Sequence, residues 1–149
     1  MKKIILFTIL IVSLALVFAC KSQPKPQPQL TDTEKAFKAI YDHHREDLIL
    51  DGAEKYTVVK DDTLSALSKH FYEHGLYYPV IMLASSDVVL DPDKIAPGME
   101  LTIPNLQKNL DDPKAKENIK SFLGEIAKLS EDRNRHEDAT AMRELADSL

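Results

Sequence analysis

The chain has 149 residues, a formal net charge of −5 and a single cysteine. One cysteine excludes an intrachain disulfide and a cysteine-rich metal site. The acidic balance argues against nucleic acid as a partner, because binding to a phosphate backbone depends on neutralising it with Lys and Arg. The length allows one ordinary domain, or one small module with helical extensions.

Residues 1–19 predict a secretory signal peptide. Lys2 and Lys3 form a short positive segment, and residues 4–19 carry no charge and are almost wholly aliphatic. This apolar run is shorter than the stretch of about 20 residues that a transmembrane helix needs. Without the two lysines the formal net charge changes from −5 to −7, so we expect a strongly acidic exported chain.

The signal peptide ends at Cys20, and residues 16–20, LVFAC, resemble a bacterial lipobox. The lipobox cysteine is acylated and becomes the first residue of the mature protein. Phe18 stands where a small or hydroxyl residue is usual, so the match is of the relaxed kind found in spirochaetal lipoproteins. The resemblance implies a palmitate-type lipid anchor on Cys20 and a place on a bacterial membrane, facing the periplasm. The alternative is an uncleaved signal anchor without lipid.

Residues 20–30 predict a spacer, because three prolines alternate with polar residues in the sequence KSQPKPQPQL that follows the cysteine. Such a segment favours the extended polyproline II conformation, which rises about 3.1 Å per residue. Ten residues would hold the folded part roughly 30 Å from a bilayer.

Residues 31–52 predict an N-terminal helix. Thr31 and Glu34 match a capping box, in which each side chain satisfies a free backbone N–H of the first turn. Gly52 predicts the end, since glycine adopts the left-handed conformation after a helix at no steric cost. One face carries the residues that recur at spacings of three and four, namely Phe37, Ile40, Tyr41, His44 and Leu48.

Residues 54–105 have a β-α-α-β pattern. The β-branched and aromatic residues 56–59 predict the first strand, and residues 101–103 predict the second. Two helices are predicted between the strands. Asp62 is the expected N-cap of the first, which ends at Gly75. The second is short, at residues 80–84, and follows Pro79, which suits a first helical turn. A proline followed by glycine at 97–98 predicts a type II turn before the second strand.

Residues 111–149 predict two amphipathic helices. Asp112 is a cap that precedes a proline suited to the first helical turn. The first apolar stripe consists of Ile119, Phe122, Leu123, Ile126 and Leu129. Ser130, followed by two acidic residues, predicts the N-cap of the second helix, whose weaker stripe is Ala139, Met142, Leu145, Ala146 and Leu149.

The β-α-α-β segment resembles a LysM module, through YTVVKDDTLSALSKHFY and then YYPVIMLASSDVVLDPDKIAPGMELTIP, which cover 49 of 149 residues. The resemblance implies an α+β fold, with one βααβ LysM module flanked by the N-terminal helix and the two C-terminal helices. Since a fifty-residue module alone is marginally stable, we expect these helices to pack together or on the module.

LysM modules bind glycans that contain N-acetylglucosamine, so the resemblance implies peptidoglycan as the partner. The site would lie between the loop after the first strand and the loop before the second. Backbone amides can bond an N-acetyl carbonyl and apolar side chains can cover its methyl group, so no metal or cofactor is needed. A single site should be weak, and avidity along a polymer would matter. Carried over, the glycan-binding residues are Asp61, Asp62, Thr63, Leu64, Ser85, Ser86, Asp87, Ile95 and Pro97.

Two positions depart from the family. Asp61 replaces a glycine, and Ser85 replaces an asparagine that braces the loop before the second strand. These departures motivate an alternative, an envelope scaffold whose LysM fold no longer binds glycan and whose helical stripes recruit a protein. A third hypothesis is cation sensing by the acidic loop that contains Asp87, Asp91 and Asp93.

Other clusters carry weaker signals. His70 and His74 are four apart on a predicted helix and could share a metal, but no third ligand is evident, and the helix dipole alone favours histidine there. For the adjacent histidines His43 and His44 we likewise expect no metal: His44 should pack against the protein or face the rim, and His43 should be solvated. Tyrosines 72, 77 and 78 could stack on a sugar, although core packing is the simpler interpretation. Since no catalytic constellation is present, we expect a protein that is not an enzyme.

Overall fold

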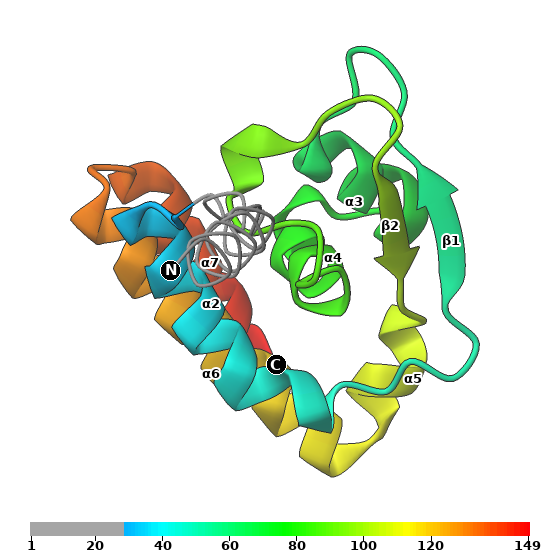
Figure 1. Cartoon of the computed structure of the whole chain (residues 1–149). Coiled ribbons are helices and arrows are strands. Elements are labelled where there is room, and N and C mark those ends of the chain that lie inside the picture. The colour runs from blue at the N-terminus through cyan, green and yellow to red at the C-terminus, as the bar shows by residue number, and fades with distance from the viewer. Residues whose placement is uncertain (1–28) are drawn as a thin grey trace, which may run out of the picture.

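The structure is a computed structural model that describes residues 29–149. The signal peptide, Cys20 and most of the predicted spacer lie outside these residues. Within the described part, no helix is both long enough and apolar enough to span a bilayer. The helices and strands, in chain order, are α2 Asp32–His44, β1 Glu54–Thr57, α3 Leu64–Tyr72, α4 Tyr78–Ala84, β2 Glu100–Ile103, α5 Leu106–Asp111, α6 Pro113–Asp132 and α7 His136–Ser148 (Figure 1).

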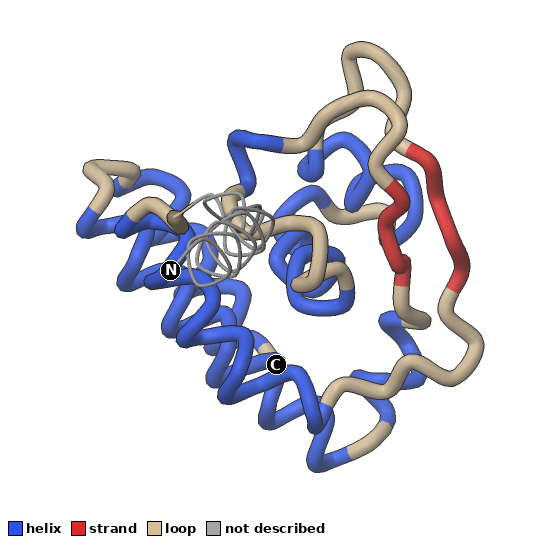
Figure 2. The backbone as a smooth tube through the Cα atoms, in the orientation of Figure 1, coloured by secondary structure: helices blue, strands red, loops and turns tan. Residues whose placement is uncertain are grey.

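The β-α-α-β order is confirmed. β1 and β2 form a two-stranded antiparallel sheet in which Glu54 is the register partner of Ile103. Figure 2 shows the two strands side by side at one edge of the molecule, with α3 and α4 on their inner side. The whole arrangement is a mixed α+β fold, with a small sheet and flanking helices, as the sequence predicts.

Helix α6 is the centre of the helical part, where it contacts α2, α5 and α7 and also reaches α4 of the β-α-α-β segment. We call α2, α5, α6 and α7 the helical layer. Its apolar stripes belong to one continuous core that also contains the apolar residues of the sheet side of the molecule. Figure 1 shows α2, α6 and α7 along one side of the molecule, and α3, α4 and the two strands on the other. This packing confirms the expectation that the helices pack together and on the small module. The core includes Phe37, Tyr41, Val80, Ile81, Leu101, Ile119, Phe122, Ile126 and Met142.

The predicted capping box is present, since the Glu34 N–H donates to Thr31 Oγ1 (3.2 Å) and the Thr31 N–H donates to the Glu34 carboxylate (2.7 Å). The helix is shorter than predicted, however. α2 ends at His44, a single 3₁₀ turn follows at Arg45–Asp47, and the chain is extended from Leu48. Leu48 is buried outside the helix, so its place in the apolar pattern reflects burial and not helical periodicity.

The first helix of the β-α-α-β segment begins and ends differently from the prediction. Thr63 is its N-cap, because the Thr63 hydroxyl accepts from the Ala66 N–H at 3.1 Å. Asp62 does not cap it. The helix ends at Tyr72, with Glu73 in the left-handed conformation (φ 61°), so Gly75 belongs to the next turn. The first strand also begins two residues earlier than expected.

The predicted cap at Ser130 is wrong, because Ser130 is buried inside α6. The break between the last two helices comes after Asp132, where Asn134 adopts φ 61°. The cap at Asp112 is confirmed, since its carboxylate accepts from the Lys114 and Ala115 N–H groups. The short helix α5 was not predicted.

Candidate functional site

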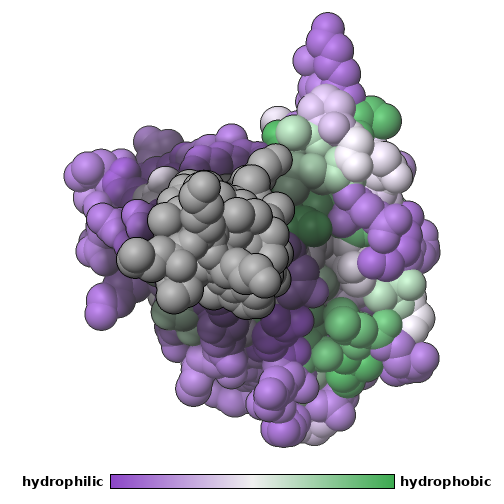
Figure 3. Space-filling model, viewed as in Figure 1, coloured by the Kyte–Doolittle hydropathy of each residue, from purple (hydrophilic) through white to green (hydrophobic). Residues whose placement is uncertain are grey.

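The loop between β1 and α3, the first predicted glycan loop, projects from the molecule in Figure 1, and Figure 3 shows a hydrophilic tip at this end. Asp61 is exposed and has φ 72°, the left-handed backbone that glycine adopts without cost. Aspartate adopts this conformation at a steric cost that glycine would not have.

The other predicted residues of this loop, Asp62, Thr63 and Leu64, make contacts that stabilise the conformation of the loop and the start of α3. The Asp62 carboxylate accepts from the Val59 N–H and from the Tyr56 hydroxyl, both at 2.8 Å. The bond from the Tyr56 hydroxyl raises the pKa of that tyrosine. The Thr63 hydroxyl caps α3, and Leu64 is buried in the core. A ligand at this loop would therefore meet backbone groups and the exposed Asp61 and Thr63.

Ser85, in the second predicted loop, is buried, and its hydroxyl is held by β2. It accepts from the Thr102 N–H at 2.9 Å and donates to the Thr102 carbonyl at 3.3 Å. The serine thus braces the loop before the second strand, which is the role that the resemblance assigns to asparagine. Ser85 supports the loop and does not present its side chain to a ligand.

Ser86 and Asp87 face α2. They line a hollow of about 220 Å³ together with Tyr41 and Arg45, and the Arg45 guanidinium lies 3.4 Å from the Asp87 carboxylate. The N-terminal helix therefore borders the second loop, which the sequence did not predict.

Ile95 and Pro97 complete the predicted set. Ile95 packs against the core and Pro97 is exposed, ahead of Gly98 at φ 91°. The Gly98 N–H donates to the Val58 carbonyl, and the Val58 N–H donates to the Met99 carbonyl, both at 2.8 Å. These two bonds join the two predicted loops at the same end of the sheet.

The acidic loop is paired with cationic side chains. Arg133 lies 3.4 Å from the buried Asp91 and 2.9 Å from Asp93. Arg135 also bonds Asp93 and holds the pKa of that carboxyl below its usual range. Lys94 bonds Glu34 at the start of α2 (3.0 Å). These acids anchor the loop to the helical layer and have their charges compensated, which disfavours them as a cation site.

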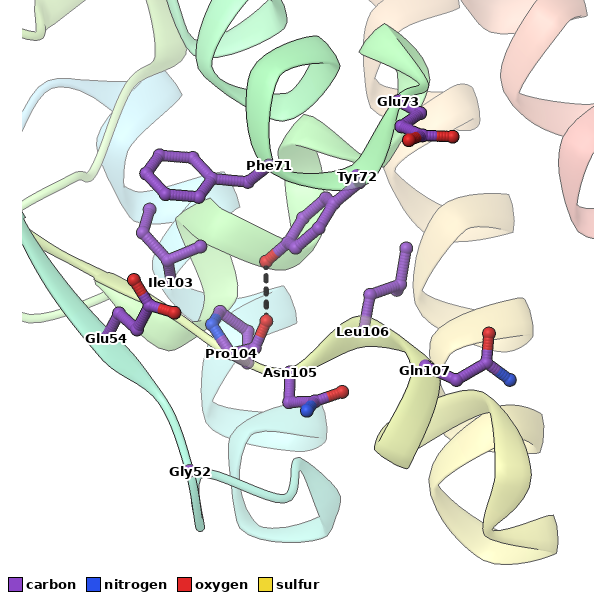
Figure 4. A pocket seen from close by; sticks show the side chains of 10 residues that line it. All are labelled: Gly52, Glu54, Phe71, Tyr72, Glu73, Ile103, Pro104, Asn105, Leu106 and Gln107. Carbon is purple, nitrogen blue, oxygen red and sulfur yellow. Dashed lines mark hydrogen bonds between the residues drawn. The ribbon is translucent and has the colours of Figure 1, made fainter.

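A larger hollow, of about 370 Å³, lies at the opposite end of the sheet (Figure 4). Tyr72 lines it and donates its hydroxyl to the Pro104 carbonyl at 3.0 Å. Tyr77 is buried, and burial raises the pKa of Tyr78 to about 12. The three tyrosines therefore do not share an exposed stacking platform. The remaining lining residues are Gly52, Glu54, Phe71, Glu73, Ile103, Asn105, Leu106 and Gln107.

His70 and His74 do not share a helix face, because α3 ends before His74. The His74 ring accepts from the Leu76 N–H at 3.3 Å and caps the turn that follows. The other histidine pair lies at the contact between α2 and α6. There His43 is exposed and His44 is buried, and Glu125 adds a carboxylate that the sequence did not point to.

Comparison with known proteins identifies the β-α-α-β segment. Residues 56–104 match the LysM domain, a non-catalytic module that binds glycans containing N-acetylglucosamine, such as peptidoglycan. The chain is also 47% identical over 49 residues to "Potassium binding protein Kbp" of Escherichia coli O6:H1. That match covers 33% of this chain and 33% of the relative, so the chain spans one third of the relative's length. No solved structure matches the chain significantly.

Proposed function

We propose that the LysM domain at residues 56–104 binds peptidoglycan, and that the chain is a non-catalytic envelope lipoprotein anchored through Cys20. The observation that carries the proposal is the LysM match, placed on a structure whose two candidate loops meet at Val58 and Gly98. Both loops expose residues around this junction, including Asp61 and Pro97. Their backbone amides and carbonyls can bond an N-acetyl group without a metal.

The anchor is supported by sequence alone, since residues 1–28 lie outside the described part. The lipobox-like segment ends at Cys20, and a proline-containing spacer separates it from α2. A spacer of roughly 30 Å would let the domain reach a polymer near the membrane while limiting its range. Labelling of growing cells with an alkyne-tagged fatty acid tests this part, and Cys20→Ala should abolish incorporation.

Sedimentation with purified peptidoglycan sacculi tests glycan binding. The full chain, kept soluble in a mild detergent, should sediment with sacculi, and chitin oligomers should compete. Ala96→Arg places a long charged side chain on the exposed second loop and should weaken binding at least tenfold. Gln107→Arg, at the hollow of Figure 4, is the matched control and should bind like the original chain. If the original chain stays in the supernatant at low salt, the proposal is wrong. If Gln107→Arg weakens binding and Ala96→Arg does not, the glycan binds at the hollow of Figure 4 and not at the two loops.

The scaffold hypothesis is the competing function. The helical stripes that were expected to recruit a partner lie in the chain's own core, so a protein partner would need another surface. The left-handed backbone at Asp61 is the observation that favours lost glycan binding. If the original chain fails to bind sacculi and Asp61→Gly restores binding, the scaffold hypothesis gains support.

Potassium binding, which the relative's name states, is a weaker candidate for this chain. Asp91 and Asp93 are paired with Arg133 and Arg135, and Asp87 lies near Arg45. Because these cations already compensate the acidic loop, we favour glycan as the ligand. Calorimetry with K⁺ that shows no heat would remove the candidate.

A further inference from the structure

Three potential metal ligands come together where the C-terminal end of α2 meets α6. One ring nitrogen each from His43 and His44 and one carboxylate oxygen from Glu125 lie within 4.8 Å of one another. Metal ligands are typically about 3–4 Å apart when each bond is 2.0–2.2 Å long. Since His43 and the Glu125 side chain are both solvent-accessible, small rotations would bring all three to one ion.

The His44 ring is held in a fixed orientation. It is 2% exposed, and its Nδ1 lies 2.7 Å from Asn118 Oδ1. The Asn118 amide is itself fixed, because its Nδ2 donates to the His44 carbonyl at 2.9 Å. Asn118 therefore presents an acceptor to Nδ1, which must carry the proton. A bond of this kind from the non-ligating nitrogen is the usual support of a metal-bound histidine.

This orientation leaves the second nitrogen as an acceptor that faces another acceptor. His44 Nε2 lies 3.2 Å from Glu125 Oε1. With Nδ1 protonated and the carboxylate ionised, the two lone pairs repel unless a cation lies between them. A proton would satisfy this pair. A tetrahedral ion with bonds of about 2.05 Å to each atom would separate them by about 3.3 Å, close to the observed distance.

We propose that His43, His44 and Glu125 form a site for a divalent transition metal, of which Zn²⁺ is the best fit. Two imidazoles and one carboxylate suit Zn²⁺, Cu²⁺ or Ni²⁺ better than Ca²⁺ or Mg²⁺, which prefer oxygen ligands. Water would complete the coordination. The ion would join α2 to α6, whose ligands His44 and Glu125 are 81 residues apart, and so fix these two helices of the helical layer against each other.

Titration of the full chain in mild detergent with Co²⁺, followed by competition with Zn²⁺, tests the site. We expect one equivalent of Co²⁺ to produce the visible absorption of a tetrahedral complex and Zn²⁺ to displace it. His43→Ala and Glu125→Gln change solvent-accessible side chains, so both variants should fold, and each should weaken binding at least tenfold. His136→Ala, an exposed histidine on α7, is the matched control and should leave the affinity unchanged.

Thermal unfolding gives a second readout, because an ion that binds only the folded state raises Tm. Zn²⁺ should raise the Tm of the original chain and of His136→Ala, but not that of the double variant His43→Ala/Glu125→Gln. If the original chain binds no Co²⁺ or Zn²⁺, or binds them no better than the double variant, the proposal is wrong. A proton shared between His44 and Glu125 would then account for their contact.

Discussion

Both regions have local polar caps, but the longest side-chain bonds differ between them. Within the LysM domain the longest described one, from Tyr72 to Pro104, spans 32 residues, whereas in the helical layer the bond from His44 to Glu125 spans 81. In the LysM domain, Asp62 bonds a backbone group three residues away, and Thr63 bonds one three residues ahead. In the helical layer, Asn109 bonds Ile49 across 60 residues. Short-range bonds shape loops that can be recognised as a sequence motif. Long-range bonds fix how helices lie against each other and leave no local pattern.

The largest expected effect tests whether the two regions form one cooperative unit. Phe122→Ala in α6 removes a fully buried ring that lies 6.2 Å from the ring of Tyr41. We expect a loss of about 3–5 kcal/mol in the free energy of unfolding and a single transition for both regions, because the core is continuous. Denaturant unfolding, followed by circular dichroism and tyrosine fluorescence, measures both. Ser121→Ala, exposed on the same helix, should change stability by less than about 0.5 kcal/mol. Two separate transitions would show that the regions fold independently.

A long-range polar bond should have the next largest effect. Asn109 is fully buried, and its side chain accepts from the Ile49 N–H at 2.8 Å and donates to the Ile49 carbonyl at 2.9 Å. Asn109→Ala leaves both backbone groups without these partners, so we expect a loss of about 2–3 kcal/mol. Gln107→Ala on the exposed side of α5 is the control. Equal stability of the two variants in urea would contradict the role assigned to long-range bonds.

A local change in the LysM domain should have a smaller effect on the free energy of unfolding, and this effect should be stabilising. Asp61→Gly relieves the left-handed backbone at φ 72° and should stabilise the chain by about 0.5–1 kcal/mol. Asp62→Gly should instead destabilise it, because the loop loses the bonds to Val59 and Tyr56. Thermal unfolding of the two variants should show a higher Tm for Asp61→Gly and a lower Tm for Asp62→Gly than for the original chain. A destabilising Asp61→Gly would show that the aspartate side chain stabilises the loop.

The smallest effect concerns the capping box. The Thr31 N–H, and then Lys94, lower the pKa of Glu34 from 4.5 to about 2. Since the folded pKa lies below the unfolded value, the stabilising contribution is present above about pH 4.5 and is lost as the pH falls toward 2. A carboxyl ¹³C titration should show this pKa directly, and Lys94→Ala should raise it. Titration at the ordinary value would mean that the box does not form in solution.

The elements that sequence predicted well are those with local causes. The capping box at Thr31, the cap at Asp112 and the turn at Gly98 all depend on residues within a few positions. The errors at Asp62 and Ser130 arose because both are good capping residues whose side chains are used otherwise. Asp62 bonds the preceding loop, and Ser130 is buried where α6 continues. Local propensity could not reveal either tertiary environment.

The candidate glycan loops follow from the resemblance, but the uses of their side chains do not. That the Ser85 hydroxyl braces β2, and that Arg45 approaches Asp87, depend on contacts that only the folded chain creates. The cluster with Glu125 was missed for the same reason. Glu125 is 81 residues from His44, and nothing in the sequence around the two adjacent histidines points to it.

The register pairing of Glu54 with Ile103 has a topological consequence. The chain enters and leaves the LysM domain at two points that adjoin each other, as in an insertion between α2 and α5. Segments with neighbouring ends can be excised, transplanted or circularly permuted with short linkers. Here the obstacle to excision is the apolar face of α4, which α6 covers. A transplanted domain would therefore need polar replacements on that face, whereas a circular permutant that joins residues 54 and 103 would keep the register of its sheet.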